Sequence, residues 1–182
     1  MPFPKKPMLQ PLAFAVIAML AIVSCSEPES KFAKYGTVVE AVILTDDGAF
    51  RGINLGDKMD SVQLKEAGPA TEADDGYLYY EYKLDSSNAF DVAYTFDEKG
   101  LAQIQSEITI NDPANTERIF NSFKLYFDDH FGKSANHQGY TVWSVRSEKF
   151  GDVKINLSDE SAEMTVPNSP GKLDIWIYIE PK

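Results

Sequence analysis

Few side chains in this sequence could carry out catalysis or hold a metal ion. His130 and His137 are its only histidines, and Asp128 or Asp129 could join them as metal ligands. A solvated histidine at a helix end explains the same pattern better. Residues 169–172 fit Ser-x-x-Lys, but the Pro-Gly pair inside them prevents the one-turn helical spacing that this chemistry needs. We therefore expect no catalytic residue, no metal site and no cofactor.

Cys25, the only cysteine, has a setting typical of lipid attachment. Two lysines near the N-terminus precede residues 9–23, which carry no charge, as in a secretory signal. This run is shorter than the roughly 20 residues of a membrane-spanning helix, and Pro11 interrupts its start. The small residue Ser24 favours cleavage directly before Cys25. The alternative is an ordinary secreted protein with an unmodified cysteine.

In the bacterial lipoproteins that this segment resembles, the cysteine becomes the new N-terminus and receives acyl chains. Two or more such chains anchor a protein stably in a bilayer. Ser26 stands where an aspartate would resemble an inner-membrane retention signal. We expect a lipid anchor at Cys25 in the outer membrane, with the domain facing either the periplasm or the outside.

The charge of the chain limits its partners. Residues 1–24 carry two lysines and no acid, so the formal net charge changes from −11 to −13 after their removal. The 158 residues that remain suffice for one domain or two small packed repeats. Such a charge disfavours nucleic acid and anionic lipid headgroups, which bind clustered Lys and Arg. We expect no nucleic acid partner, and contact with the membrane only through the lipid.

Alternation of apolar and polar residues predicts most of the first half as sheet, because a strand with one buried face has period two. The turn after residue 96 is too short for a parallel crossover, so its flanking strands should pair antiparallel. The expected elements are strands over residues 37–44 and 50–55, a short helix ending at Gly68, and strands over residues 77–83, 90–96 and 104–110.

The second half opens with the most strongly patterned helix. Asp112 and Pro113 break the sheet, and Asn115 or Thr116 can cap the helix, which should end at Gly132. Its apolar stripe at spacings of three and four comprises Ile119, Phe120, Phe123, Phe127 and Phe131. The strands expected after it cover residues 140–146, 153–157 and 173–179.

Both halves share one order, a helix followed by three strands, which predicts a duplication. The second copy differs by a long acidic connection over residues 158–172. Long loops are often functional, and whether this one is functional stays open. The expected divisions are a signal peptide over 1–24, an acylated cysteine and tether over 25–35, a first repeat with a leading strand over 36–110, and a second repeat over 111–182.

Three short motifs carry a family resemblance: Ile-Asn-Leu-Gly-Asp-Lys-Met-Asp-Ser-Val at 53–62, Ala-Gly-Pro at 67–69, and Val-Ala-Tyr-Thr-Phe-Asp at 92–97 with Gly100 and Leu101 following. They resemble the repeat of BamE-like and β-lactamase-inhibitory-protein-like domains. The second half keeps Phe-Gly-Lys at 131–133 but lacks the Gly-Pro pair. The resemblance implies an α+β fold of two helix-plus-antiparallel-sheet repeats packed in tandem. It also implies a non-catalytic envelope module that binds proteins through its sheet and loops, without naming the partner.

Aromatic residues on the polar faces of two strands are the candidate protein-binding residues. Tyr77 and Tyr79 alternate with the apolar residues of one strand, and Trp176 and Tyr178 with those of another. Aromatic side chains of this kind often carry interface energy. Packing under a loop or the other repeat is the alternative. We expect a lipid-anchored protein-binding module, with a small-ligand carrier and an envelope hydrolase as the other hypotheses.

Overall fold

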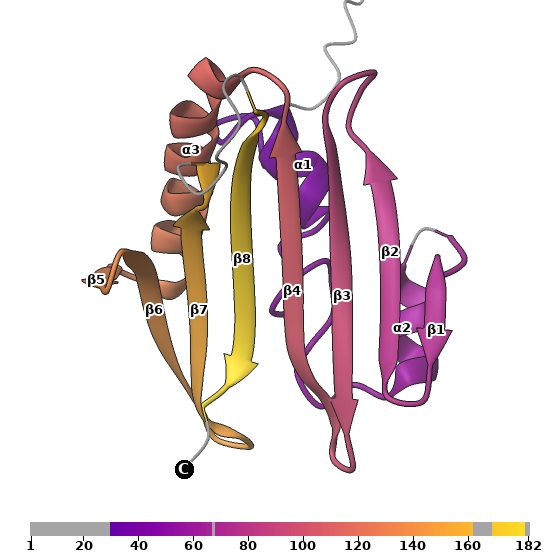
Figure 1. The fold of residues 1–182 in the computed structure, drawn as a ribbon. Helices are drawn as coiled ribbons and strands as arrows, with labels where there is room; N and C mark the ends of the chain where they lie inside the picture. The colour runs from indigo at the N-terminus through magenta and orange to yellow at the C-terminus, as the bar shows by residue number, and fades with distance from the viewer. Residues whose placement is uncertain (1–29, 67, 162–168, 181–182) are drawn as a thin grey trace, which may run out of the picture.

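One antiparallel sheet organises the fold, which is of the predicted α+β class. A computed structural model describes residues 30–66, 68–161 and 169–180. Within these ranges, eight strands pair in the order β1-β2-β3-β4-β8-β7-β6-β5 (Figure 1). They are β1 (Glu72–Asp74), β2 (Tyr77–Lys83), β3 (Ala89–Asp97), β4 (Gly100–Ile110), β5 (Ala135–His137), β6 (Tyr140–Ser147), β7 (Gly151–Asp159) and β8 (Gly171–Ile179). The last strand of each half therefore meets the other at the centre of the sheet.

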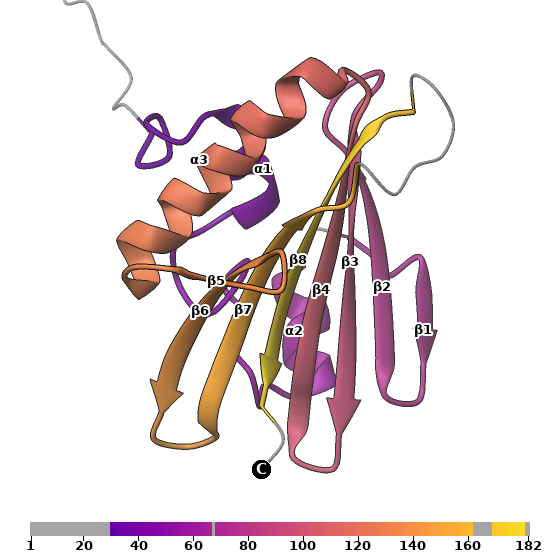
Figure 2. The same ribbon diagram turned by 60° about the vertical axis from the view of Figure 1, so that its left-hand side comes forward.

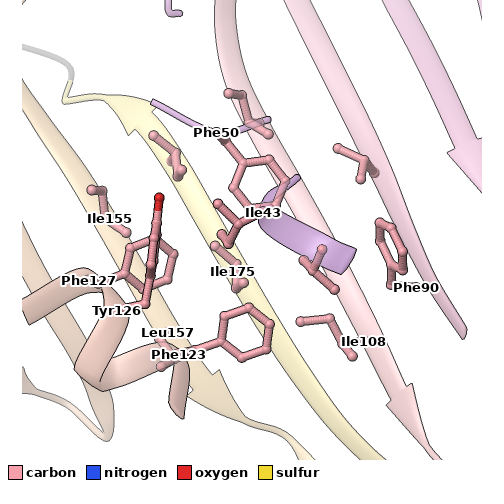
Figure 3. Close-up of a cluster of buried hydrophobic side chains, with 14 of the residues drawn as sticks. Ile43, Phe50, Phe90, Ile108, Phe123, Tyr126, Phe127, Ile155, Leu157 and Ile175 are labelled. Atoms are coloured by element: carbon pink, nitrogen blue, oxygen red, sulfur yellow. The ribbon is translucent and has the colours of Figure 1, made fainter. Parts of the chain in front are cut away.

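The helices of the described chain are α1 (Thr37–Ile43), α2 (Met59–Lys65) and α3 (Pro113–Phe131), and all lie on one face of the sheet (Figure 2). The inward residues of β3, β4, β7 and β8 form the floor of the core beneath them. Phe123 and Phe127 of α3 pack above Ile155, Leu157 and Ile175 (Figure 3). The core is thus one continuous layer between helices and sheet.

The strand predicted over residues 37–44 is wrong, because this segment forms helix α1. Its β-branched composition favours a strand. Val39, Val42 and Ile43 are nevertheless buried together, at the spacing of three and four that places residues on one helical face. A helix in this place covers the sheet and packs against α3. The helical spacing of the buried residues was thus a better predictor of this segment's structure than its β-branched composition.

The second short strand, predicted over residues 50–55, is also wrong. Phe50 and Ile53 form only an isolated bridge, and the chain between them reverses direction. Arg51 (φ 54°) and Gly52 (φ 76°) both take the left-handed conformation that such a tight reversal requires. Phe50 and Ile53 are both buried in the core.

Helix α3 is confirmed, with a different cap and a shifted stripe. Asp112, not Asn115 or Thr116, caps it by accepting a hydrogen bond from the Ala114 amide. Gly132 ends it with φ 86°, as predicted. Its most deeply buried residues are Thr116, Ile119, Phe123, Tyr126 and Phe127, whereas Phe120 and Phe131 are only partly buried.

The expected signal peptide and Cys25 lie outside the described residues. Of the expected tether, the described part packs on the domain, with Phe32 and Tyr35 buried. Their rings lie 6.0 and 5.2 Å from that of Tyr126 on α3. The Tyr35 hydroxyl also donates a hydrogen bond to Asp129. In the part of the chain that the structure describes, no helix has the length and apolar character needed to cross a bilayer.

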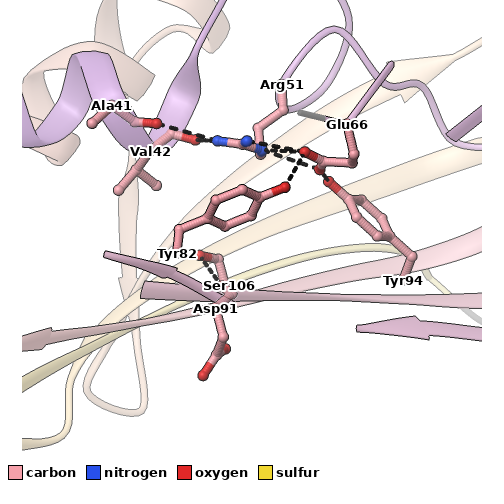
Figure 4. Close-up of polar contacts among 8 residues, drawn as sticks. All are labelled: Ala41, Val42, Arg51, Glu66, Tyr82, Asp91, Tyr94 and Ser106. Carbon is pink, nitrogen blue, oxygen red and sulfur yellow. Dashed lines mark hydrogen bonds and ion pairs between the residues drawn. The ribbon is translucent and has the colours of Figure 1, made fainter. Parts of the chain in front are cut away.

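A buried ion pair links the first two helices to the sheet (Figure 4). Nε of Arg51 donates to both carboxylate oxygens of Glu66 at 3.1 Å, and Nη2 donates to one of them at 2.9 Å. Nη1 donates to the carbonyl oxygens of Ala41 and Val42 in α1, at 3.2 and 2.9 Å. Both charged side chains are almost wholly buried. Arg51 therefore holds the end of α1 and the residue after α2 in one place.

Two tyrosines complete the network from the sheet side. The hydroxyls of Tyr82 and Tyr94 each donate a hydrogen bond to Glu66. The guanidinium of Arg51 lies 4.6 Å from the ring centre of Tyr82, within reach of a cation–π attraction. Burial lowers the pKa of Arg51, but hydrogen bonds to Glu66 and its charge offset this effect, so the pKa is raised overall. The guanidinium of Arg51 therefore stays protonated in its buried position.

Replacing Arg51 by leucine should destabilise the protein by about 3–5 kcal/mol, because it leaves the carboxylate of Glu66 buried without its partner. Replacing Lys65 by leucine is the matched control, since its ion pair with Asp57 at 2.7 Å is partly exposed and should contribute less than about 1 kcal/mol. Urea unfolding of both variants measures the difference. Equal losses would contradict the role given to the buried pair.

Candidate functional site

The face of the sheet that carries none of the described helices is the candidate site, and we call it the open face. Strand register fixes which of its residues lie next to one another. A first line across the strands, the aromatic row, contains Tyr79, Ala93, Gln105, Trp176 and Asn156. A second line beside it, the carboxylate row, contains Glu81, Asp91, Glu107 and Asp174, with Ser158 at its end.

All four aromatic residues predicted from the sequence lie on the open face. Tyr77 and Tyr79 are on β2, Trp176 and Tyr178 are on β8, and each is half-buried. Strands β3 and β4 separate the two pairs, so about 14 Å of sheet lies between them. The structure thus places them on one surface but does not gather them into one cluster.

Trp176 and Tyr178 border a groove of about 470 Å³ on this face. Asn156 is held toward Tyr178, because its Nδ2 donates to the Tyr178 hydroxyl at 3.5 Å. The groove lies over strands β4, β6, β7 and β8. Its lining residues are Gln103, Tyr140, Asn156, Glu160, Asp174, Trp176 and Tyr178.

Beside the groove, three polar side-chain atoms are buried without a hydrogen-bond partner among the described residues. They are Oδ1 of Asn156, Oγ of Ser158 and Oδ1 of Asp174. An unpaired buried acceptor costs about 1–3 kcal/mol, so proteins rarely leave one without a reason. Three of them on neighbouring positions of β7 and β8 mark this end of the open face as a place where polar partners are missing.

Burial changes the ionisation of the carboxylate row. It raises the pKa of Asp174 to about 6, and the negative charges of Glu107 and Glu160 add to this effect. The positive charge of Lys172 and a hydrogen bond from Trp176 oppose it. Burial raises the pKa of Asp91 as well. Lys172 forms an ion pair at 2.7 Å with Glu107, so its positive charge acts on both Glu107 and Asp174.

An apolar cavity of about 240 Å³ lies on the other side of the sheet, beneath the end of α3. It is lined by Gly48, Ala49, Asn54, Leu55, Phe131, Val145, Ser147, Phe150, Val153, Ile155 and Ile177. Small-molecule pockets usually have about 300–1,000 Å³. The cavity is the feature that the ligand-carrier hypothesis needs, at a smaller size than is usual.

Sequence reasoning identified the aromatic residues but missed Asn156, Ser158 and Asp174. A signal was present, because Asp174 alternates with Leu173 and Ile175 in the same strand as Trp176. The partners across the sheet were not predictable, because β8 pairs with β4, about seventy residues earlier. Crowding of Asp174 against Glu107 follows only from that pairing.

Replacing Asp174 by asparagine should stabilise the protein at pH 7.5, because it removes a charge that burial disfavours. The folded-state pKa of about 6 lies above the ordinary value of 3.8. The folded protein therefore binds a proton between these values that the unfolded chain does not, and this contribution to stability grows as the pH falls. The gain from Asp174→Asn should thus be largest above pH 6 and shrink toward pH 4.

Denaturant unfolding of the Asp174→Asn variant and the unchanged protein at pH 7.5 and 4.5 measures this gain. The control is Asp152→Asn, which removes the same charge from an exposed residue. A gain from Asp174→Asn that is the same at both pH values, or no larger than that of the control, would contradict the assigned environment.

No family model, curated protein or solved structure gives a significant match to the chain.

Proposed function

We propose that this protein binds another protein through the open face of its sheet and carries out no reaction there. The observation that carries the proposal is the groove beside Trp176, where half-buried aromatic rings adjoin buried polar atoms without partners. Tyrosine and tryptophan are enriched at protein interfaces and dominate their binding energy. A partner that covers this face could supply the missing hydrogen bonds once the side chains of Asn156, Ser158 and Asp174 rotate toward it.

The two alternative hypotheses, an envelope hydrolase and a small-ligand carrier, have less support than protein binding. A hydrolase needs a general base or nucleophile aligned with a substrate. Asp174 and Glu160 are the acidic residues that line the groove, but it lies open along the sheet and does not enclose a substrate in a deep pocket. A carrier would use the apolar cavity under α3, which is below the usual size for a ligand site. The open face therefore remains the better candidate.

We further propose that the two halves are tandem repeats of one unit, as the BamE-like and inhibitory-protein-like resemblance implies. Two features support this. Each half runs from a helix through one three-residue strand to three longer strands, and the sheet order is symmetric about the β4–β8 pair. On this proposal β8 corresponds to β4, so Trp176 and Tyr178 are not the counterparts of Tyr77 and Tyr79 on β2. The groove would then lie mostly on the second repeat, with Gln103 of the first repeat at its border.

We propose also that Cys25 anchors the protein to the outer membrane through attached acyl chains. The charge-free run before it and the small residue Ser24 support this assignment. Anchoring in a membrane raises the effective concentration of a binding module near partners in the same envelope.

A photo-crosslinking amino acid at Gln105 should capture the partner in intact cells. Gln105 lies in the middle of the aromatic row, between Ala93 and Trp176. The same amino acid at Leu125, which is exposed on the outer side of α3, is the control. We expect a discrete crosslinked species from position 105, which weakens when Trp176 or Tyr79 is replaced by alanine.

Two results would overturn this proposal. One is equal crosslinking from positions 105 and 125. The other is a crosslink from position 105 that is insensitive to both alanine variants. Circular dichroism of the purified variants confirms that their folding is unchanged.

Replacing Cys25 by alanine should release the protein from the membrane fraction, because no acyl chain can then be attached. Fractionation of cells, with detection of the protein in membrane and soluble fractions, measures this change. Ser26→Ala is the control and should leave membrane association intact. A Cys25→Ala variant that stays in the membrane fraction would exclude the lipid anchor.

A further inference from the structure

We propose that the partner segment is basic, and that its lysine or arginine side chains lie along the carboxylate row and enter the groove beside Asp174. This inference rests on the proposed protein-binding function and adds the chemistry of the partner. Four features of the open face carry it.

The first feature is an unbalanced line of negative charge. Glu81, Asp91, Glu107 and Asp174 lie opposite one another on four adjacent strands. Strands are about 4.8 Å apart, and like charges directly opposite each other destabilise a sheet. Among the described residues, Lys172 forms the only ion pair recorded within this row, at 2.7 Å from Glu107. The charge of Lys172 also acts on Asp174. Glu81 and Asp91 have no basic partner among the described residues, although Asp91 accepts hydrogen bonds from the Tyr79 hydroxyl and the Glu107 amide.

Other lysines on this face do not neutralise the row. Lys154 lies farther along β7, where it donates a hydrogen bond to Ser144 and pairs with Glu180 at 3.5 Å. Lys83 is exposed at the end of β2, opposite Ala89. A basic partner segment could supply positive charge that the described chain does not place along this row.

The second feature is the set of unpaired atoms at the end of the row. Ser158 is only 6% exposed, and its Oγ has no hydrogen-bond partner within the described part of the chain. Two neighbouring atoms are also unpaired, Oδ1 of Asp174 and Oδ1 of Asn156. The amide oxygen of Asn156 is an acceptor only, and so is each oxygen of an ionised Asp174. Lysine and arginine carry several donors and no acceptor, so they complement this set.

The third feature is the aromatic row beside the carboxylates. Trp176 lies two residues from Asp174 on the same face of β8, and Tyr79 lies two residues from Glu81 on β2. A cation near an aromatic face gains a further attraction, and the apolar stems of lysine and arginine pack well on such rings. Carboxylates next to aromatic rings therefore favour basic side chains over a small inorganic cation.

The fourth feature is the linear arrangement. Carboxylates spread along a line do not converge on one point, and within the described ranges no three potential ligands could hold a metal ion. The spacing of neighbouring strands instead approaches the 5–6 Å between side chains three or four residues apart on a helix. A helix with a basic face could thus contact several carboxylates of the row at once.

The test uses the mature full chain and a fluorescent helical peptide of alanine with arginine at every fourth position. Fluorescence anisotropy at physiological salt measures binding, and the same peptide with glutamine in place of arginine is the first control. We expect the arginine peptide to bind and the glutamine peptide to bind weakly or not at all. The double variant Glu107→Gln/Asp174→Asn should weaken binding of the arginine peptide at least about tenfold.

A second double variant separates the site from general attraction to an acidic protein. Glu148→Gln/Asp152→Asn removes the same charge from two exposed positions near the β6–β7 turn. It should bind the arginine peptide about as tightly as the unchanged protein. Equal weakening by both double variants would overturn the inference.

Two further results distinguish the basic segment from the protein-binding function itself. If Trp176→Ala weakens the Gln105 crosslink in cells while Glu107→Gln/Asp174→Asn changes neither the crosslink nor peptide binding, the partner is not basic although the open face binds it. If calcium ions alone bind the protein and Asp174→Asn abolishes that binding, the row is a cation site and the inference fails. Loss of the crosslink in the Glu107→Gln/Asp174→Asn variant, together with weaker peptide binding, supports it.

Discussion

The buried pair of Arg51 and Glu66 is the interaction on which the first half of the fold depends. Helix α2 has seven residues and fully buries only Val62, so apolar contact alone would hold it weakly. Through Arg51 and two tyrosines, Glu66 instead fixes the end of α2 to α1, β2 and β3. In the second half, apolar contact holds the helix in place, because α3 has nineteen residues and five buried side chains. A shared order of elements is thus stabilised by polar contacts in one half and by apolar contacts in the other.

The two faces of the sheet contrast because the helices cover only one. On the covered face almost every inward residue is apolar and fully buried. On the open face, half-buried rings and carboxylates lie close enough to shield one another from water, and that shielding raises the pKa of Asp174. A surface that served only solubility would have its charges fully hydrated and paired or well separated. The open face instead keeps Asp91 and Asp174 partly desolvated, which agrees with its proposed use as a contact surface.

The alternation of apolar and polar residues correctly predicted the strands in which each residue's burial follows from its own place in the sequence. Residues 90–96, 104–110 and 173–179 alternate because each strand has one apolar face, and this period is visible without knowledge of the neighbours. Helix α1 was missed because β-branched composition outweighed the spacing of Val39, Val42 and Ile43. The contact of Arg51 with Glu66 and the carboxylate row could not be predicted, because they depend on which distant segments fold together. Trp176 was found from its alternation, and its polar surroundings required the register.

The packing of Phe32 and Tyr35 on α3 has a geometric consequence for an anchored protein. These rings attach the N-terminal end of the described chain to the helical side of the sheet. Ser30 is five residues from Cys25, so the chain between them spans at most about 18 Å. With acyl chains on Cys25, the helical layer would lie next to the bilayer and the open face would point away from it. A partner would then approach from the aqueous side, without competing with lipid headgroups for the same surface.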